Sequence, residues 1–211
     1  MFTGIIQETG TIKSIQNDGQ TKKLIIESKK LLKNRKIGDS ISVNGICSTI
    51  TKISHDEFEV QYMQETLKTT NVNSFKENQT VNLELPIKAG ETFDGHFVQG
   101  HIDTTGIVEN INSAGETAEI TIKFDKKYTN LTALKGSITI NGVSLTISKI
   151  EMGMLTVSLI PHTLTATDLG NLKKGDTVNL EFDLLAKQIK HLLETKEDEI
   201  KYEFLRERNL I

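Results

Sequence analysis

The stretch Ser40-Ile41-Ser42-Val43-Asn44-Gly45 returns 97 positions later as Ser137-Ile138-Thr139-Ile140-Asn141-Gly142, and this recurrence decides the fold. At the same offset, the segments Gly38–Pro86 and Lys135–Asp183 are identical at eighteen of forty-nine positions. A period near one hundred residues is too long for a solenoid repeat. The chain is therefore predicted to contain two domains of the same fold.

Composition narrows the class of protein. Aromatic residues make up 5% of the 211 residues and Trp is absent, so the cores should consist of Ile, Leu and Val. A net charge of −3 without a dense basic block argues against nucleic acid as a partner. The single cysteine excludes an internal disulfide framework and fits a reducing compartment. No signal peptide is recognisable, and no apolar run approaches the roughly 18–20 residues needed to span a bilayer. We therefore expect a cytoplasmic protein that does not enter a membrane.

Twelve short runs rich in Ile, Val and Thr predict strands, six in each half. They are Gly10–Ile15, Lys23–Glu27, Ser40–Val43, Cys47–Ile53, Glu57–Tyr62 and Thr80–Leu85, then Gly106–Ile111, Ala118–Phe124, Ser137–Ile140, Ser144–Ile150, Leu155–Ile160 and Thr177–Phe182. The Asn-Gly pairs at 44–45 and 141–142 are typical of type I′ hairpin turns. Six short strands per half predict an all-β protein of two tandem six-stranded Greek-key barrels, because closure removes exposed edges. An open sandwich is the alternative.

These runs also set the predicted boundaries. Residues 1–88 form the first barrel, 89–97 a linker after Pro86, 98–184 the second barrel, and 185–211 a C-terminal α-helix. Two further short helices are predicted at Leu31–Arg35 and Tyr128–Leu134. The C-terminal helix has apolar residues on one face, at Ile189, Leu192, Leu193, Ile200 and Phe204. This face either packs on its own domain or serves oligomerisation.

Five strings, in order along nearly the whole chain, resemble the riboflavin synthase family. They are Met1-Phe2-Thr3-Gly4-Ile5-Ile6, Asn44-Gly45-Ile46-Cys47-x-Thr49, Gly95-His96-Phe97-Val98-x-Gly100-His101-Ile102-Asp103, Asn141-Gly142-Val143-Ser144-Leu145-Thr146 and Ile160-Pro161-His162-Thr163-Leu164. The resemblance implies an enzyme that converts two molecules of 6,7-dimethyl-8-ribityllumazine into riboflavin and 5-amino-6-(ribitylamino)uracil. It also implies that neither a metal nor an organic cofactor is needed.

By the same resemblance, each barrel binds one lumazine and the chain forms a homotrimer. Each site lies where the first barrel of one subunit meets the second barrel of its neighbour, and an association with lumazine synthase is left open. The implied substrate-binding residues are Gly4, Ile5, Ile6, Ser40, Cys47, Ser48, Thr49, Gln61, Tyr62, Met63, Gln64, Glu65, Thr66, Gly100, His101, Ile102, Lys135, Ser144, Leu145, Thr146, Ser158, Leu159, Ile160, Pro161, His162 and Thr163.

The implied catalytic residues are Cys47, His101, Lys135, Ser144 and Asp183. A dismutation must tell the donor lumazine from the acceptor, and the two copies differ at these positions: Cys47 aligns with Ser144, for example. Imidazole titrates near neutral pH, so His101 is a candidate for accepting a proton from the lumazine 7-methyl group. For Cys47 we favour substrate positioning and proton contact over an obligatory covalent adduct, since a nucleophilic role needs a lowered thiol pKa.

Two positions qualify this interpretation. His96 and His101 are spaced i, i+5 with no Cys or third His nearby, which is poor spacing for a metal site. For His96 both a structural and a functional role are considered. Ser48 stands where the family usually has Leu. We expect Ser48 to lie close to the pocket and to alter rate or affinity.

Two other classes of function compete. One is a non-catalytic lumazine- or flavin-binding protein of the antenna type, and the other is a tandem-barrel interaction module. An antenna protein is expected to lose the ionisable groups of the second copy, whereas this chain keeps His101, Lys135 and Asp183. The interaction module does not explain why the copies differ at polar positions. The sequence therefore favours the enzyme.

Overall fold

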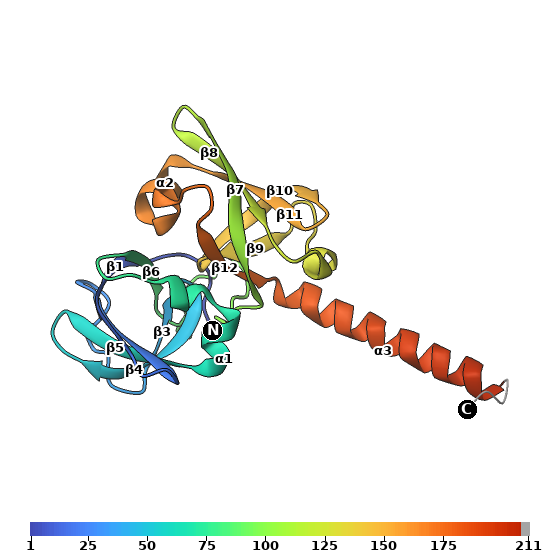
Figure 1. Cartoon of the computed structure of the whole chain (residues 1–211), viewed down its shortest axis with the longest axis horizontal. Helices are drawn as coiled ribbons and strands as arrows, with labels where there is room; N and C mark the ends of the chain where they lie inside the picture. Colours follow the sequence, from blue (N-terminus) through green and yellow to red (C-terminus); the bar gives the residue numbers. More distant parts are fainter. Residues whose placement is uncertain (208–211) are drawn as a thin grey trace.

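The computed structural model describes the backbone of residues 1–207 and the side chains of residues 1–196. Two closed six-stranded barrels lie against each other, and helix α3 (Leu184–Glu207) projects away from them (Figure 1). The two barrels and the helix confirm the predicted fold class. Closure excludes the open sandwich.

The first barrel consists of six antiparallel strands. They are β1 (Glu8–Asn17), β2 (Thr21–Glu27), β3 (Ser40–Val43), β4 (Ile46–Ile53), β5 (Glu57–Met63) and β6 (Thr80–Glu84). Around the barrel their order is β1-β2-β5-β4-β3-β6, and β6 pairs with β1 to close the ring. All six predicted runs of this half are strands.

The second barrel repeats this topology strand for strand. Its members are β7 (Thr104–Ala114), β8 (Thr117–Lys123), β9 (Ser137–Ile140), β10 (Val143–Glu151), β11 (Met154–Leu159) and β12 (Thr177–Phe182). Their order around the barrel is β7-β8-β11-β10-β9-β12. The internal repeat in the sequence is therefore a repeat of the fold.

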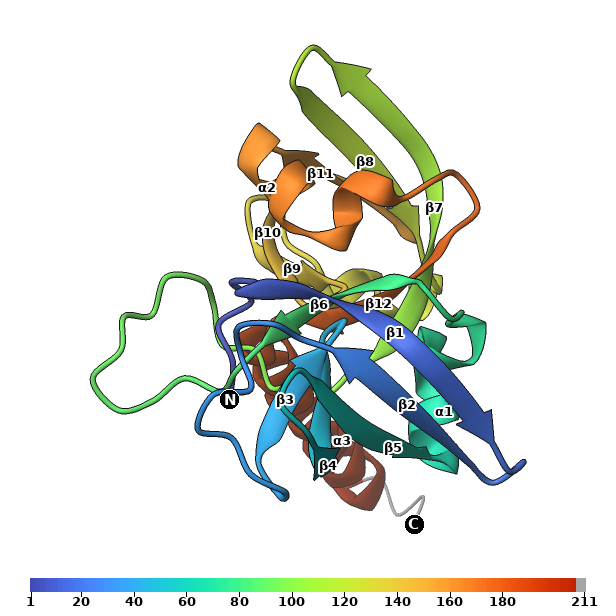
Figure 2. The same cartoon turned by 90° about the vertical axis from the view of Figure 1, so that its left-hand side faces the viewer.

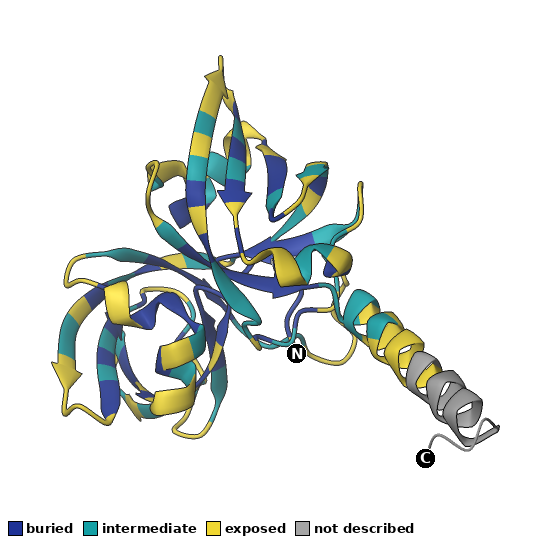
Figure 3. Ribbon diagram, turned by 45° about the vertical axis from the view of Figure 1, so that its right-hand side comes forward, coloured by how far each residue is buried: buried dark blue, intermediate teal, exposed yellow. Residues whose placement is uncertain are grey.

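Alternating side chains fill each barrel separately. In β8 the side chains of Ala118, Ile120 and Ile122 are buried while their neighbours face outward. Figure 3 shows the same alternation of buried and exposed positions along several strands. Each barrel has its own core of mainly Ile, Leu and Val, joined in the second barrel by Phe124 and Phe182. The predicted composition of the cores is confirmed.

The Asn-Gly turns have the expected backbone. Asn44 and Gly45 both have positive φ angles, of 46° and 82°, and Asn141 and Gly142 repeat them at 47° and 78°. Two successive positive φ angles define the type I′ turn, whose twist matches that of the flanking strands. These turns fix the register of β3 with β4 and of β9 with β10.

Short helices follow β5 and β11, where none was predicted. They are α1 (Gln64–Thr69) with the 3-10 helix η1 (Asn71–Ser74), and α2 (Pro161–Ala166) with η3 (Asp168–Asn171). The repeated Thr-Leu-x-x-Thr motif explains them: the Thr70 hydroxyl donates to the carbonyl of Thr66 at 2.6 Å and accepts from the amide of Val72 at 3.4 Å. Thr167 makes the same pair of bonds in the second copy. The motif therefore links two short helices.

The prediction of a helix at Leu31–Arg35 is wrong. This segment is a turn in which the amide of Arg35 donates to the carbonyl of Leu32 at 3.0 Å. Asn34 has a φ angle of 62°, and this left-handed conformation ends the turn before a helix can form. The helix predicted at Tyr128–Leu134 exists in part, as the 3-10 helix η2 (Lys126–Leu131), which starts where Asp125 accepts from the amide of Lys127.

The segments that precede the two barrels cross over, each onto the other barrel. The carbonyl of Gly4 accepts from the amide of Ser144 at 2.8 Å, and the carbonyl of Gly100 accepts from the amide of Cys47 at 2.9 Å. Further along, Ile6 packs against the second core, while Ile102 packs against the first. Each barrel therefore carries part of the other half of the chain.

A buried polar network joins the barrels. The carboxylate of Asp168, which is 6% exposed, accepts hydrogen bonds from the side-chain amides of Asn44, Asn82 and Asn141 at 3.0, 2.7 and 2.8 Å. The side chain of Asn179 donates to the backbone of Asn44 at 2.9 Å across the same contact. Burial raises the pKa of Asp168 to about 7, against the opposing effect of the three amide donors. The network thus ties residues of both barrels to one carboxyl group.

Helix α3 leaves its own domain after the first turn. Ala186 packs against the second core, and the ammonium of Lys187 lies 3.1 Å from the carboxylate of Asp103. Beyond this point the apolar stripe is open, because Ile189, Leu192 and Leu193 are each between 58% and 63% exposed. Packing of the stripe on its own domain is thus excluded for these residues. Ile200 and Phe204 lie outside the described side chains, and residues 208–211 outside the described backbone. Over the described part of the chain, no helix combines the length and apolarity needed to cross a membrane.

We expect Asp168→Ala to lower the unfolding free energy by about 3 kcal/mol, because three buried amide groups lose their acceptor. Chemical denaturation of the two proteins at pH 6 measures the difference. Asn171→Ala, an exposed position on the same 3-10 helix, is the matched control and should change stability little.

The loss should depend on pH. Because the pKa of Asp168 is raised in the folded protein, its contribution to stability is complete below its ordinary pKa of 3.8 and is lost as the pH rises through about 7. The difference between wild type and Asp168→Ala should therefore narrow from pH 5 to pH 8. A difference that widens over this range would show that the carboxylate form is the stabilising one.

Candidate functional site

A first cluster of predicted residues lies on the outer face of the first barrel. Alternation along β4 turns Cys47 and Thr49 outward, and alternation along β5 does the same for Gln61 and Met63. The crossing segment adds His101, which is exposed and follows the Gly100 carbonyl that binds Cys47. The remaining members are Ser40, which pairs with Thr49, the half-buried Ile102, and Gln64, Glu65 and Thr66 at the start of α1.

The side chains of Ser48 and Tyr62 point the other way, into the barrel. The Ser48 hydroxyl donates to the carbonyl of Ile46 at 2.9 Å and lies 2.8 Å from the Tyr62 hydroxyl. Burial raises the pKa of Tyr62. The second copy has Leu145 and Leu159 at these positions, so a hydroxyl pair replaces an apolar pair. The departure at Ser48 is therefore a change of core packing, and its side chain does not face the outer cluster.

A second cluster occupies the equivalent face of the second barrel. Thr146, Ser158 and Ile160 are exposed there, and Ser144 is half-buried. The crossing segment contributes Gly4, exposed Ile5 and half-buried Ile6, and the α2 region contributes Pro161, His162 and Thr163. Leu145 packs against the second core and Leu159 is buried in it. The predicted residues thus fall into two sets, one on each barrel.

Because of the crossover, each cluster contains a residue from the other half of the sequence. Ile5 and His101 are equivalent in the repeat, yet His101 lies beside Cys47 of the first barrel and Ile5 beside Ser144 of the second. The first cluster thereby combines a thiol with an imidazole. Sequence alignment alone assigns His101 to the second copy and misses this pairing.

The crossover depends on two glycines. A Cβ atom on Gly4 would lie 2.6 Å from the Cβ of Ser144, and one on Gly100 would lie 2.7 Å from the Cβ of Cys47. Both glycines also have left-handed backbone, with φ angles of 79° and 78°. Only glycine combines this conformation with so close an approach. Each crossing segment can thus approach the strand of the other barrel this closely only because Gly4 or Gly100 has no side chain.

Two buried glutamates, which were not predicted, hold the crossing segments. Glu84 accepts from the amides of Thr3 and Gly4 at 2.7 and 3.1 Å. Glu181 accepts from the amides of Gln99 and Gly100 at 2.7 and 2.9 Å. Burial raises the pKa of Glu84, and that of Glu181 to about 7. The signal was present in the sequence, since both end an identical string of five residues at 80–84 and 177–181.

His96 belongs to the second cluster. Its Nδ1 lies 2.7 Å from the hydroxyl oxygen of Ser144, and its backbone amide donates to the carbonyl of Thr3 at 3.1 Å. Burial lowers the pKa of His96, and the charge of Asp183 opposes this shift. Asp183 also caps α3 by accepting from the amide of Leu185 at 2.8 Å. Ser144, His96 and the Asp183 charge are therefore neighbours in the fold.

Lys135 has an unusual backbone. Its φ angle is 62°, whereas the equivalent residue of the first copy is Gly38 with a φ angle of 93°. The amides of both residues make the same bond, to the carbonyls of Ile147 and Ile50 at 2.9 Å. A lysine in the left-handed region is strained relative to glycine, and such strain gathers at functional sites. The exposed Lys135 thus occupies a position whose backbone conformation suits glycine better.

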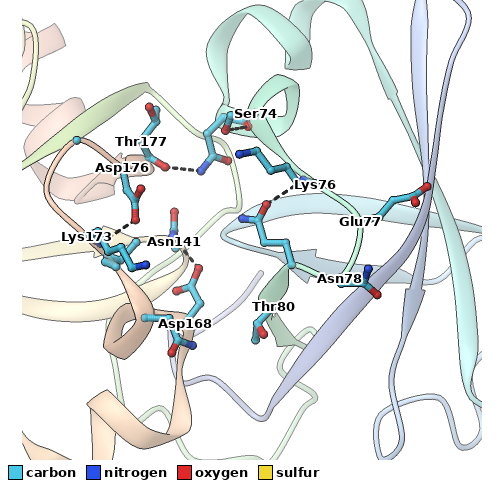
Figure 4. Close-up of a pocket in the computed structure, with 15 residues that line it drawn as sticks. Ser74, Lys76, Glu77, Asn78, Thr80, Asn141, Asp168, Lys173, Asp176 and Thr177 are labelled. Atoms are coloured by element: carbon cyan, nitrogen blue, oxygen red, sulfur yellow. Dashed lines mark hydrogen bonds between the residues drawn. The ribbon is translucent and has the colours of Figure 1, made fainter.

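A large cavity lies elsewhere. Its volume is about 740 Å³, and residues of both barrels line it around Asp168, including Lys76 and Lys173 (Figure 4). None of the predicted site residues borders this cavity. A smaller cavity of about 250 Å³ beneath the linker includes Thr3 and Ile5. Figure 2 shows the linker as a long loop that projects from the body of the molecule.

Comparison with known proteins agrees with this architecture. The model of the lumazine binding domain matches residues 3–86 and 99–183. Riboflavin synthase of Bacillus subtilis (strain 168) is 42% identical over 193 residues, which cover 92% of this chain and 90% of that enzyme. Riboflavin synthase of Saccharomyces cerevisiae is 36% identical over 213 residues, covering 95% of this chain and 90% of that enzyme.

Solved structures of LumP are similar as well. The complex of LumP with 6,7-dimethyl-8-(1′-D-ribityl)lumazine superposes with a TM-score of 0.79 at 29% identity, over 86% of this chain and 98% of LumP. The riboflavin complex gives a TM-score of 0.80 at 30% identity, over 86% of this chain and 99% of LumP. The chain thus carries the lumazine binding domain twice. It belongs to the riboflavin synthase family.

We expect Lys135→Gly to raise the unfolding free energy by about 0.5–1 kcal/mol, because relief of the left-handed strain exceeds the entropy that glycine adds to the unfolded chain. The same change should lower affinity for 6,7-dimethyl-8-ribityllumazine or turnover, since it removes the ammonium group. Thermal unfolding and ligand titration measure the two effects.

Asn78→Gly is the matched control. Asn78 is also left-handed, with a φ angle of 65°, and its equivalent is Gly175. It should gain less stability than Lys135→Gly, because Asn tolerates this conformation better, and its affinity and turnover should match wild type. If Lys135→Gly binds and turns over lumazine as wild type does, Lys135 has no role at the site.

Proposed function

We propose that the chain is a riboflavin synthase, which converts two molecules of 6,7-dimethyl-8-ribityllumazine into riboflavin and 5-amino-6-(ribitylamino)uracil. The observation that carries this proposal is the pair of equivalent clusters that differ in chemistry. One has Cys47 and His101, and the other has Ser144 with His96. Two similar sites suit two identical substrates, and their differences suit unequal roles.

The reaction fits a protein that supplies only side chains. One lumazine gives up a four-carbon unit and the other receives it, so the two products together contain all atoms of the two substrates. The transformation therefore needs no external oxidant or reductant. What the protein has to supply is orientation of the two rings and transfer of protons.

His101 is our candidate for proton transfer. A lumazine bound beside Cys47 meets the exposed side chain of His101, whose backbone is held by the Gly100 carbonyl bond to Cys47 and by Glu181. The 7-methyl group must lose a proton to become nucleophilic, and a neutral imidazole can accept it. Cys47 positions the ring at the same place.

The second cluster supplies the other polar contacts. We assign Ser144 and Thr146 to the ring and Lys135 to the ribityl chain or an anionic ring. Asp183 stands at the start of α3, where its charge acts on His96. The backbone at residues 61–66 and 158–163 reads the polar edge of the pyrimidinedione ring.

A lumazine-binding protein without catalysis is the second candidate, because LumP shares this fold. Ser48 gives that candidate no support, since its side chain lies in the barrel core and not in the outer cluster. His101 and Asp183 belong to the two clusters, and the chain also keeps the exposed Lys135. We therefore rank the synthase first.

The test is to mix the chelator-treated protein with 6,7-dimethyl-8-ribityllumazine and to follow the products by absorbance and chromatography. Riboflavin and 5-amino-6-(ribitylamino)uracil should appear in equal amounts. His101→Ala should lower turnover by roughly 100-fold or more while lumazine affinity changes far less. Tight binding without turnover in wild type would favour the LumP-like function, and equal losses of turnover and affinity would make His101 a binding residue.

We further propose that the chain works as a homotrimer in the cytoplasm, with sites between the first barrel of one subunit and the second barrel of the next. Both clusters are open on the surface of a single chain, and α3 presents an unpacked apolar stripe. Burial of this stripe against other subunits would remove apolar surface from water. The unpaired thiol of Cys47 fits a reducing compartment. An association with lumazine synthase remains a prediction without structural support.

The double variant Leu192→Glu/Leu193→Glu should shift the trimer toward monomer and lower turnover, because charged carboxylates replace apolar contacts. Sedimentation velocity at micromolar concentration measures the assembly. His191→Glu/Thr195→Glu adds the same charge to another face of α3 and should leave the trimer intact. A wild-type protein that sediments only as a monomer would refute the assembly.

A further inference from the structure

The linker contributes His96 to the second cluster only. His96 is hydrogen bonded to the hydroxyl of Ser144 at 2.7 Å, and its own amide is fixed to the carbonyl of Thr3. Ser144 is fixed in turn, because its amide donates to the carbonyl of Gly4. The two side chains thus meet across the crossing segment, and both backbones are anchored to it.

The first barrel has no such pair. Cys47 occupies the position of Ser144 and makes the equivalent backbone bond, to the carbonyl of Gly100. Its thiol has no hydrogen-bond partner among the side chains that the structure describes, and it is exposed. The two clusters therefore also differ in His96, which comes from the linker between the repeats and not from a repeated position.

The surroundings keep the imidazole suited to this bond. Burial disfavours the charged form of His96 and lowers its pKa, while the nearby charge of Asp183 limits the shift. A neutral imidazole has one nitrogen that donates and one that accepts. In either tautomer Nδ1 holds the hydroxyl oxygen of Ser144 in place, and when Nδ1 is the acceptor it also fixes the hydroxyl hydrogen. The hydroxyl oxygen keeps further hydrogen-bonding capacity, and Ser144 is half-buried, so its side chain is not closed off from the surface.

We propose that His96 is a positioning residue for the reaction: it fixes the hydroxyl of Ser144 toward the lumazine bound at the second barrel. The linker thereby makes the two lumazine sites unequal. This inference rests on the proposed synthase activity and deepens it.

Three substitutions at position 96 test the geometry. His96→Asn keeps a polar atom near the place of Nδ1, whereas His96→Gln moves it toward Nε2 and His96→Ala removes it. We expect Ala and Gln to lower kcat by roughly tenfold or more with a smaller change in KM, and Asn to retain most of the wild-type kcat. A purely structural role predicts instead that kcat follows the thermal stability of each variant. The melting temperatures of the three proteins separate these outcomes.

A double-mutant cycle tests whether His96 acts through Ser144. In the Ser144→Ala background, His96→Ala should cause no further loss of kcat, because the hydroxyl it orients is gone. Multiplicative losses would overturn the proposal, as would a wild-type kcat in His96→Ala. An inactive wild-type protein would instead refute the proposed function. If His96→Ala does not fold, the comparison of His96→Gln with His96→Asn carries the same test.

Discussion

The exchange of short segments between the barrels is the constraint on which the rest of the structure depends. The hydrogen bonds from Ser144 to Gly4 and from Cys47 to Gly100 join the two barrels into one body. They place each cluster at a seam, which is the contact between a crossing segment and the strand it binds. Because a glycine stands at each seam, the strand and the crossing segment approach more closely than side chains allow. The positions of His101 and Ile5 follow directly from this geometry.

Three buried carboxyl groups stabilise the contact at an electrostatic cost. Glu84 and Glu181 accept hydrogen bonds from backbone amides of the crossing segments, and Asp168 accepts them from side-chain amides of both barrels. Removal of each carboxyl from water favours its protonated form, which is why burial raises all three pKa values. Hydrogen bonds only partly offset that cost. Their benefit is directional, because each carboxyl accepts only from donors that the correct docking of the barrels supplies.

The sequence predicts local and repeated features well. Period-2 alternation and the Asn-Gly turns identified the twelve strands, because these depend on neighbours along the chain. Residues such as Cys47 and Thr49, or Ser144 and Thr146, could be grouped by strand register alone. The boundaries at 88 and 97 remain predictions. The crossover, the His96–Ser144 pair and the inward turn of Ser48 could not be predicted, because each depends on packing between distant segments. Helices α1 and α2 could not be predicted from periodicity, because each spans only six residues.

The crossing segments give the two halves the geometry of an arm-exchanged dimer of a single barrel, fused by the linker. In a true dimer of identical barrels, two-fold symmetry would put the same side chain at both seams. Cys47 and Ser144 could not then differ, and neither could Ile5 and His101. Covalent fusion releases the two copies from that identity, so each can change its side chains without changing the other. A catalyst that must treat two identical molecules differently gains its asymmetry from this duplication.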